Sequence, residues 1–118
     1  MTLKELSELY YLNQEIERNR QRLEELRSKA ESPQSLALEA IIKAKQDQCI
    51  HERDRLERFI SGIDDNLTRQ IFTLRCAGGL SWARIAAKVG GGNRPNSVRR
   101  RFYRDLEKIE KSSGVAVC

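Results

Sequence analysis

Seven basic side chains and no acidic one lie between Trp82 and Arg104. Guanidinium and ammonium groups gathered in this way attract a polyanion, and arginine can bind phosphate oxygens or a guanine edge with two parallel hydrogen bonds. Residues 1–60 carry 11 Lys and Arg against 12 Asp and Glu, whereas residues 61–118 carry 11 against 5. The charge asymmetry therefore predicts a polyanion partner for the C-terminal half of the chain.

A single helix over residues 96–111 would present these charges on one side. At about 100° per residue, one face of this helix collects apolar side chains that must be buried, namely Val98, Phe102, Leu106 and Ile109. Arg100 and Arg104 lie opposite that face, with Ser97 and Arg101 close by. The basic residues thus cover the face that remains free once the core is made.

The position of each residue along this helix predicts its role on duplex DNA. The first residues of a recognition helix usually reach base edges, and later ones meet phosphates. The predicted base contacts are Asn96, Ser97 and Arg100. The predicted contacts to the DNA backbone are Arg84, Lys88, Arg94, Arg99, Arg101, Tyr103 and Arg104. For Tyr103 a half-buried aromatic position is an equal alternative, and for any single arginine a phosphate contact is favoured over base recognition.

Two shorter helices are expected ahead of the basic one. The first is capped by residues 64–66 and ends at residues 78–79, and the second is capped by Ser81 and ends at Gly90. A glycine-rich loop, residues 91–95, then leads to the final helix. A helix, a glycine-bearing turn and an arginine-rich helix are the organisation of a helix-turn-helix.

The same residues resemble a known family. Residues 79–90, Gly-Leu-Ser-Trp-Ala-Arg-Ile-Ala-Ala-Lys-Val-Gly, are similar to the G-L-S-aromatic-x-x-I-A-x-x-hydrophobic-G run of sigma-70 region 4. Residues 96–106 resemble the recognition helix of that module, and residues 69–75 resemble the helix that opens it. The resemblance covers residues 64–109 and implies a DNA-binding role in transcription. The loop with Gly90, Gly91, Gly92 and Pro95 is longer than the sigma turn, and no core-promoter domains of a full sigma factor accompany it.

The N-terminal half is expected to form two long helices. Thr2 and Glu5 fit a capping box, and a heptad seam follows at Leu9, Leu12, Ile16, Asn19, Leu23 and Leu26. Residues 32–35 break the helix, and a second helix is expected from Ser35, as its N-cap, to about Ile60. Two helices of similar length joined by a short turn should form an antiparallel hairpin.

The sequence thus predicts an all-α protein: an antiparallel two-helix hairpin over residues 1–62, a three-helix helix-turn-helix domain over 63–111, and a flexible tail over 112–118. We expect the seam to serve self-association or docking on a partner, with a plain spacer as the alternative. Asn19 either sets the register or partner number of that seam or sits at an exposed edge. A boundary after residue 62 also predicts that the basic domain folds without the hairpin.

A hairpin followed by a region-4-like module looks like small phage and prophage proteins, some of which resemble late-gene regulators of the ArpU type. We expect a sequence-specific regulator that binds double-stranded DNA, with RNA polymerase as a further candidate partner. The alternative is a phage accessory protein, either one like a small terminase subunit or one that docks on RNA polymerase or a nuclease.

Several other classes of protein are not expected. The one histidine, His51, has no nucleophile and base around it, so we expect no enzyme. The three cysteines (Cys49, Cys76 and Cys118) form no C-x-x-C pair, which disfavours zinc and predicts free thiols, with Cys76 in the core. No metal and no cofactor are expected. The absence of an apolar run of about 20 residues argues against a membrane span and, with no secretory signal, for a cytoplasmic protein of a bacterial or phage-infected cell.

Overall fold

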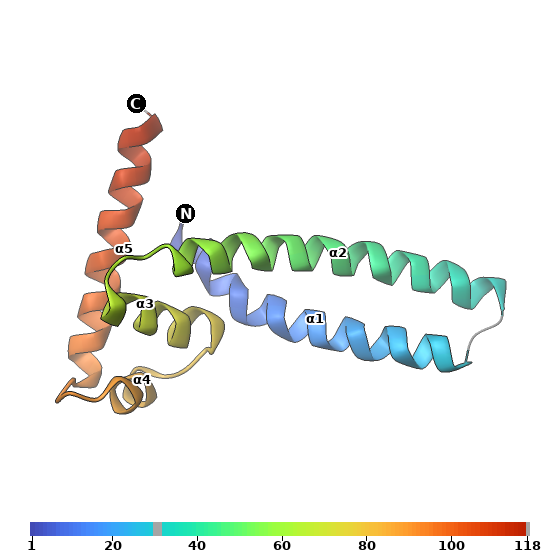
Figure 1. Ribbon diagram of the computed structural model, residues 1–118, viewed down its shortest axis with the longest axis horizontal. Coiled ribbons are helices and arrows are strands. Elements are labelled where there is room, and N and C mark those ends of the chain that lie inside the picture. The colour runs from blue at the N-terminus through green and yellow to red at the C-terminus, as the bar shows by residue number, and fades with distance from the viewer. Residues whose placement is uncertain (30–31, 118) are drawn as a thin grey trace.

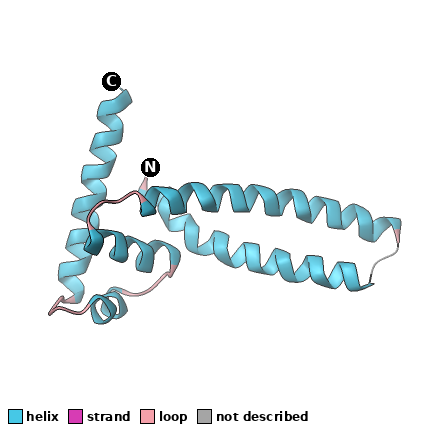
Figure 2. Ribbon diagram, viewed as in Figure 1, coloured by secondary structure: helices cyan, strands magenta, loops and turns pink. Residues whose placement is uncertain are grey.

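The computed structural model describes residues 1–29 and 32–117, and the regular structure in these residues is helical (Figure 2). The helices are α1 (Leu3–Lys29), α2 (Pro33–Ser61), α3 (Asn66–Phe72), α4 (Trp82–Val89) and α5 (Pro95–Val117), with a π-helical turn, Thr73–Ala77, continuing α3. α1 and α2 lie side by side and antiparallel, and the other helices gather at the end where α1 begins and α2 ends (Figure 1). The expected all-α class is confirmed.

Local capping interactions explain most helix ends. The Glu5 backbone N–H donates to Thr2 Oγ1 at 3.2 Å, and the Thr2 N–H donates to Glu5 Oε1 at 3.3 Å, so the expected capping box is present. Ser81 caps α4 by accepting from the Arg84 N–H at 3.3 Å, and Gly90 follows its last turn, as expected. These interactions lie within a few residues of one another, which is why the sequence pattern predicts them.

The start of α2 differs from the expectation. Ser35 was expected as the N-cap, which is wrong, because Ser32 is the N-cap and its Oγ accepts from the Ser35 N–H at 3.1 Å. Pro33 therefore lies in the first turn of the helix instead of in the loop before it. Proline is tolerated there because the first N–H groups of a helix have no intrahelical partner to lose.

α5 is longer than the sequence pattern indicates. The helix was expected over residues 96–111, but it begins at Pro95 and continues to Val117. It thus runs through residues 112–117 of the segment expected to be a tail, and Cys118 lies outside the described residues. Prediction of the end failed because Gly114 and the small residues around it carry no apolar periodicity.

The heptad seam of α1 is used within the chain. Leu9 and Leu23 are buried, and Leu12, Ile16, Asn19 and Leu26 are partly buried. The face that carries them packs against α2, and Arg27 of α1 forms an ion pair with Glu39 of α2 at 3.0 Å. The seam is therefore covered by the second helix of the same molecule and is not an open surface for another chain.

A polar pair sets the register of α1 against α2. Gln46 is buried, and its Nε2 donates to the Ile16 carbonyl oxygen at 2.8 Å. Asn19 Nδ2 donates to Gln46 Oε1 at 3.2 Å, so the amide expected to need a partner finds it in α2. Sliding the helices past each other would leave a buried amide without hydrogen bonds, which costs about 1–3 kcal/mol.

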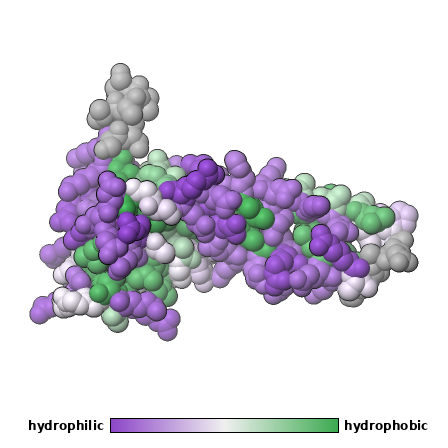
Figure 3. Space-filling model, in the orientation of Figure 1, coloured by the Kyte–Doolittle hydropathy of each residue, from purple (hydrophilic) through white to green (hydrophobic). Residues whose placement is uncertain are grey.

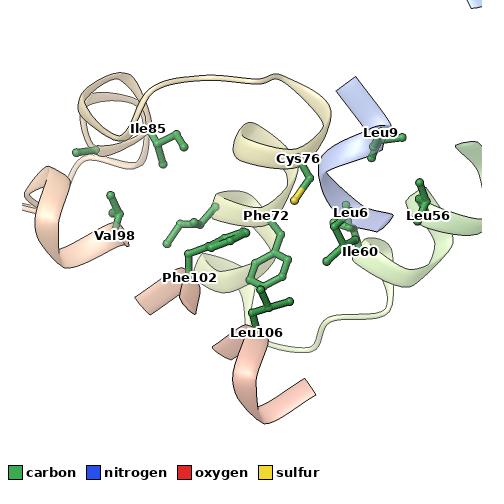
Figure 4. Packing of buried hydrophobic residues seen from close by; sticks show 12 residues of the cluster. Leu6, Leu9, Leu56, Ile60, Phe72, Cys76, Ile85, Val98, Phe102 and Leu106 are labelled. Atoms are coloured by element: carbon green, nitrogen blue, oxygen red, sulfur yellow. The ribbon is translucent and has the colours of Figure 1, made fainter. Parts of the chain in front are cut away.

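One hydrophobic core joins the α1–α2 pair to the other helices. Phe72 lies at its centre, with Phe102 of α5 on one side and Leu6 of α1 on the other (Figure 4). Leu9, Leu56 and Ile60 belong to the same cluster. The predicted boundary after residue 62 therefore passes between elements that share their buried side chains.

Candidate nucleic-acid interface

The packing of one face of α5 against the core determines which of its side chains are exposed to solvent. Val98, Phe102 and Leu106 are buried against the core, as the periodicity predicted, and Ile109 is partly buried against it. On the opposite side an outer stripe of exposed residues runs along the helix, and it consists of Asn96, Ser97, Arg100 and Arg104. The predicted base contacts and one predicted backbone contact therefore share one exposed surface of one helix.

Arg101 is held on the flank of α5 that faces α3. Its Nη2 forms an ion pair with Asp65 Oδ2 at 2.7 Å, and its Nε donates to Thr68 Oγ1 at 3.3 Å. The buried Thr68 hydroxyl lies 2.9 Å from Asp65 Oδ2 and 2.7 Å from Asp105 Oδ2, so its one proton can be donated to either carboxylate, and through Asp105 it links α3 to α5. Arg101, a predicted backbone contact, thus has a structural role in orienting α5 and lies outside the outer stripe.

The sequence pattern missed this network, although it contains one local signal. Arg101 and Asp105 are spaced i, i+4, which brings their side chains together on a helix, and Arg101 Nε lies 3.7 Å from Asp105 Oδ2. Asp65 was expected only as part of a helix cap. Its second role follows from the packing of α3 on α5, which no local spacing reveals.

Tyr103 lies on the other flank, toward α4 and α1. Its ring centroid is 5.3 Å from that of Phe102 and 6.1 Å from that of Trp82, and 42% of the residue is exposed. Tyr103 therefore resembles the half-buried aromatic given as its alternative, because its ring packs in an aromatic cluster and remains partly exposed; its contact with DNA stays a prediction. Arg99, one turn earlier on this flank, is exposed.

The remaining basic residues lie just ahead of the outer stripe. Arg84 and Lys88 are exposed one turn apart on α4. Arg94 precedes α5, and its carbonyl oxygen accepts from the Val98 N–H at 3.0 Å. α4 packs against α5, so these residues and the stripe belong to one helical unit.

The loop between α4 and α5 depends on glycine. Gly90 has φ 64° and ψ −152°, a combination that is essentially restricted to glycine, and Gly91 and Gly92 also have positive φ. Asn93 closes the loop, with its backbone N–H and its Nδ2 both donating to the Gly90 carbonyl oxygen. This closed loop sets the direction in which α5 leaves α4.

No match was found when the chain was compared with protein families, curated proteins and solved structures.

The network around Arg101 carries a marked electrostatic effect. The Thr68 backbone N–H, the Thr68 hydroxyl and then the Arg101 guanidinium stabilise the charged carboxylate and lower the pKa of Asp65 to about 2. Because the folded pKa is depressed, the interaction contributes stability above the unfolded pKa near 4, and this is lost as pH falls toward 2.

We expect Asp65→Asn to flatten the acid branch of the stability profile. An asparagine still caps α3 but cannot pair as an anion with Arg101, so the melting temperature of the variant should fall less between pH 5 and pH 2 than that of the wild type. Thermal melts followed by circular dichroism at several pH values measure this. Parallel profiles for the two proteins would show that the Asp65 carboxylate titrates normally in the fold.

The structure also bears on metal binding, membrane-spanning helices and the environment of Cys76. Within residues 1–29 and 32–117, no three His, Cys, Asp or Glu side chains come together as a metal site. None of the helices described here is sufficiently long and apolar to cross a membrane. Cys76 is buried in the core, as expected, and burial raises the pKa of its thiol to about 12.

Proposed function

We propose that the chain binds duplex DNA as a helix-turn-helix protein, with α4 as the supporting helix and α5 as the recognition helix. The observation that carries this proposal is the outer stripe of α5, which is exposed, cationic and opposite a fully packed face. A helix with its side chains is about 10–12 Å across and fits the major groove. Asn96, Ser97 and Arg100 would then lie nearest the bases, and Arg104 nearer the phosphates.

The absence of ion-pair partners for most of the basic residues near α5 supports the same role. Across the part of the chain that the structure describes, no carboxylate forms an ion pair with Arg84, Lys88, Arg94, Arg99 or Arg100. By contrast, arginines of the α1–α2 pair such as Arg20 and Arg55 are bound to neighbouring glutamates. Cations without an internal partner remain available to replace the counterions of DNA.

We expect the affinity for duplex DNA to fall steeply with salt. If roughly four to six phosphates are neutralised, log K should fall against log salt with a slope of roughly −4 to −5. Fluorescence anisotropy titrations of a labelled duplex at several salt concentrations measure the slope. A flat line would contradict the proposal.

Variants of three arginines assign the contacts. Arg104→Ala should weaken binding to all sequences alike and reduce the slope by about 1, whereas Arg100→Ala should cost about 1–3 kcal/mol on the preferred site and relax the sequence preference. Arg22→Ala, which removes an exposed arginine of α1, is the matched control and should change neither. Equal losses on specific and random DNA for Arg100→Ala would remove it from base recognition.

The biological role that we propose is that of a phage or prophage transcription regulator acting in the bacterial cytoplasm, with RNA polymerase as a further partner.

We also propose that the α1–α2 pair mediates self-association. The α1 seam is covered, but Leu36 and Ile41 of α2 are 59% and 55% exposed. Apolar surface is also visible toward the end of the α1–α2 pair that lies away from the other helices (Figure 3).

A phage accessory protein of the small terminase type remains the second candidate, since the unit of α3, α4 and α5 suits both. Size-exclusion chromatography with light scattering separates them. A regulator should be a monomer or dimer, and a ring-forming packaging subunit should be a large oligomer.

A further inference from the structure

An aromatic cavity lies on the flank of α5 that faces α1, away from the outer stripe. Its volume is about 380 Å³, within the range of small-molecule sites. Three parts of the chain line it: the start of α1, the π-helical turn with the glycine after it, and the middle of α5. The residues that matter below are Leu3, Tyr10, Tyr11, Arg75, Phe102 and Tyr103.

The cavity gathers apolar side chains that are left in contact with solvent. Among the described residues, the large hydrophobic side chains that are exposed fall in two places, the first turns of α2 and the wall of this cavity. Leu3, Tyr11 and Tyr103 form the second group, and Tyr11 is 67% exposed. Contiguous exposed aromatic rings around a depression are typical of a binding site, because their faces can stack on a flat partner.

One wall of the cavity is built by a close backbone approach. Gly79 has φ +63°, and a Cβ placed on it would lie 2.8 Å from Cδ2 of Tyr10. The Tyr10 ring therefore rests directly on this glycine and also packs edge-on against Tyr11, at 5.5 Å between centroids. This contact gives the wall a defined orientation.

Among the residues that line the cavity, Arg75 carries a charge, and this charge is positive. Its guanidinium lies over the Trp82 ring, 4.2 Å from the centroid, and its Nη1 donates to the Leu80 carbonyl oxygen at 2.8 Å. Both contacts hold the group in place. A guanidinium has five N–H donors, so the remaining ones can bind an anion that enters the cavity.

We propose that this cavity binds a small planar aromatic anion. The ring system of the ligand lies between the tyrosines of α1 and Tyr103 of α5, and its carboxylate or sulfonate meets Arg75. The aromatic walls select a flat apolar body, and the single cation selects one negative group. The proposal does not depend on DNA binding, since its ligand and its test involve no nucleic acid.

Isothermal titration calorimetry of the full chain with 1-naphthoate tests the site. We expect saturable binding of one naphthoate per chain, and binding about tenfold or more weaker for 1-naphthalenemethanol, which keeps the rings and lacks the charge. Absence of saturable heat at millimolar naphthoate, or equal affinity for the neutral alcohol, would overturn the proposal.

Variants locate the binding. Tyr11→Ala removes an exposed wall with little effect on folding and should weaken naphthoate about five- to tenfold. Arg75→Gln should weaken naphthoate but leave the neutral alcohol unchanged. Leu38→Ala, at an exposed apolar position on α2 that does not line the cavity, is the matched control and should bind as the wild type does. Equal affinities for Tyr11→Ala and the wild type would place the ligand elsewhere and refute the site.

Discussion

Phe102→Ala is expected to lower the free energy of unfolding by about 3–5 kcal/mol. Phe102 is 1% exposed, and its ring centroid lies 4.5 Å from that of Phe72 and 5.3 Å from that of Trp82. It thus connects α5 to both α3 and α4. Small proteins have a total stability of about 5–15 kcal/mol, so the variant should lose a large fraction of the stability of the fold.

Urea denaturation followed by circular dichroism measures this loss. Tyr103→Ala is the matched control, because it removes the neighbouring aromatic ring, which is 42% exposed where Phe102 is buried. It should cost about 1 kcal/mol or less. Similar losses for the two variants would show that the Phe72–Phe102 contact does not organise the core.

The second large effect concerns residues 61–118 as a separate fragment, which we expect not to fold. The sequence pattern predicted the opposite, with a boundary after residue 62. In the structure Leu6, Leu9, Leu56 and Ile60 are buried in the same cluster as Phe72 and Cys76. Burial of each such side chain is worth about 1.5–3 kcal/mol, so removing four of them withdraws about 6–12 kcal/mol. This is comparable to the whole stability of a small protein.

Thermal melts and amide NMR spectra of the fragment test this expectation. We predict no cooperative transition and poorly dispersed resonances. Point variants of the full chain give an independent measure: Leu6→Ala should cost about 2–5 kcal/mol, whereas Leu36→Ala, at an exposed position of α2, should stay within about 0.5 kcal/mol. A fragment that melts cooperatively with well-dispersed signals would restore the boundary after residue 62.

The shared core also makes the orientation of the proposed DNA-binding surface depend on the α1–α2 pair. The flanks of α5 contact α3 through the Arg101 network and α1 through Leu3, whose N–H donates to Glu110 Oε1 at 3.3 Å. The orientation of the outer stripe therefore depends on the α1–α2 pair as well as on α4. A DNA-binding defect in a variant of α1 would consequently need a folding control before it is assigned to a lost contact.

The amino-acid sequence by itself determined the features that depend on near neighbours. The capping box at Thr2, the cap at Ser81 and the end of α4 at Gly90 all follow from interactions within about four residues. The buried face of α5 follows from helical periodicity, and with it the exposure of Arg100 and Arg104. These features were predictable because a helix fixes the direction of a side chain from its position alone.

Only the tertiary structure decided which surfaces remain free. The seam of α1 is apolar and periodic in the sequence, but whether it meets α2 or another molecule depends on how the two helices pack, and here it meets α2. Arg100 and Arg101 are adjacent and chemically identical, yet of these two arginines it is Arg101 that forms an ion pair with Asp65, 36 residues away in the sequence. The physical reason is common to both cases. The packing of helices that are distant in the sequence determines which complementary group a side chain contacts, and local spacing carries no information about that group.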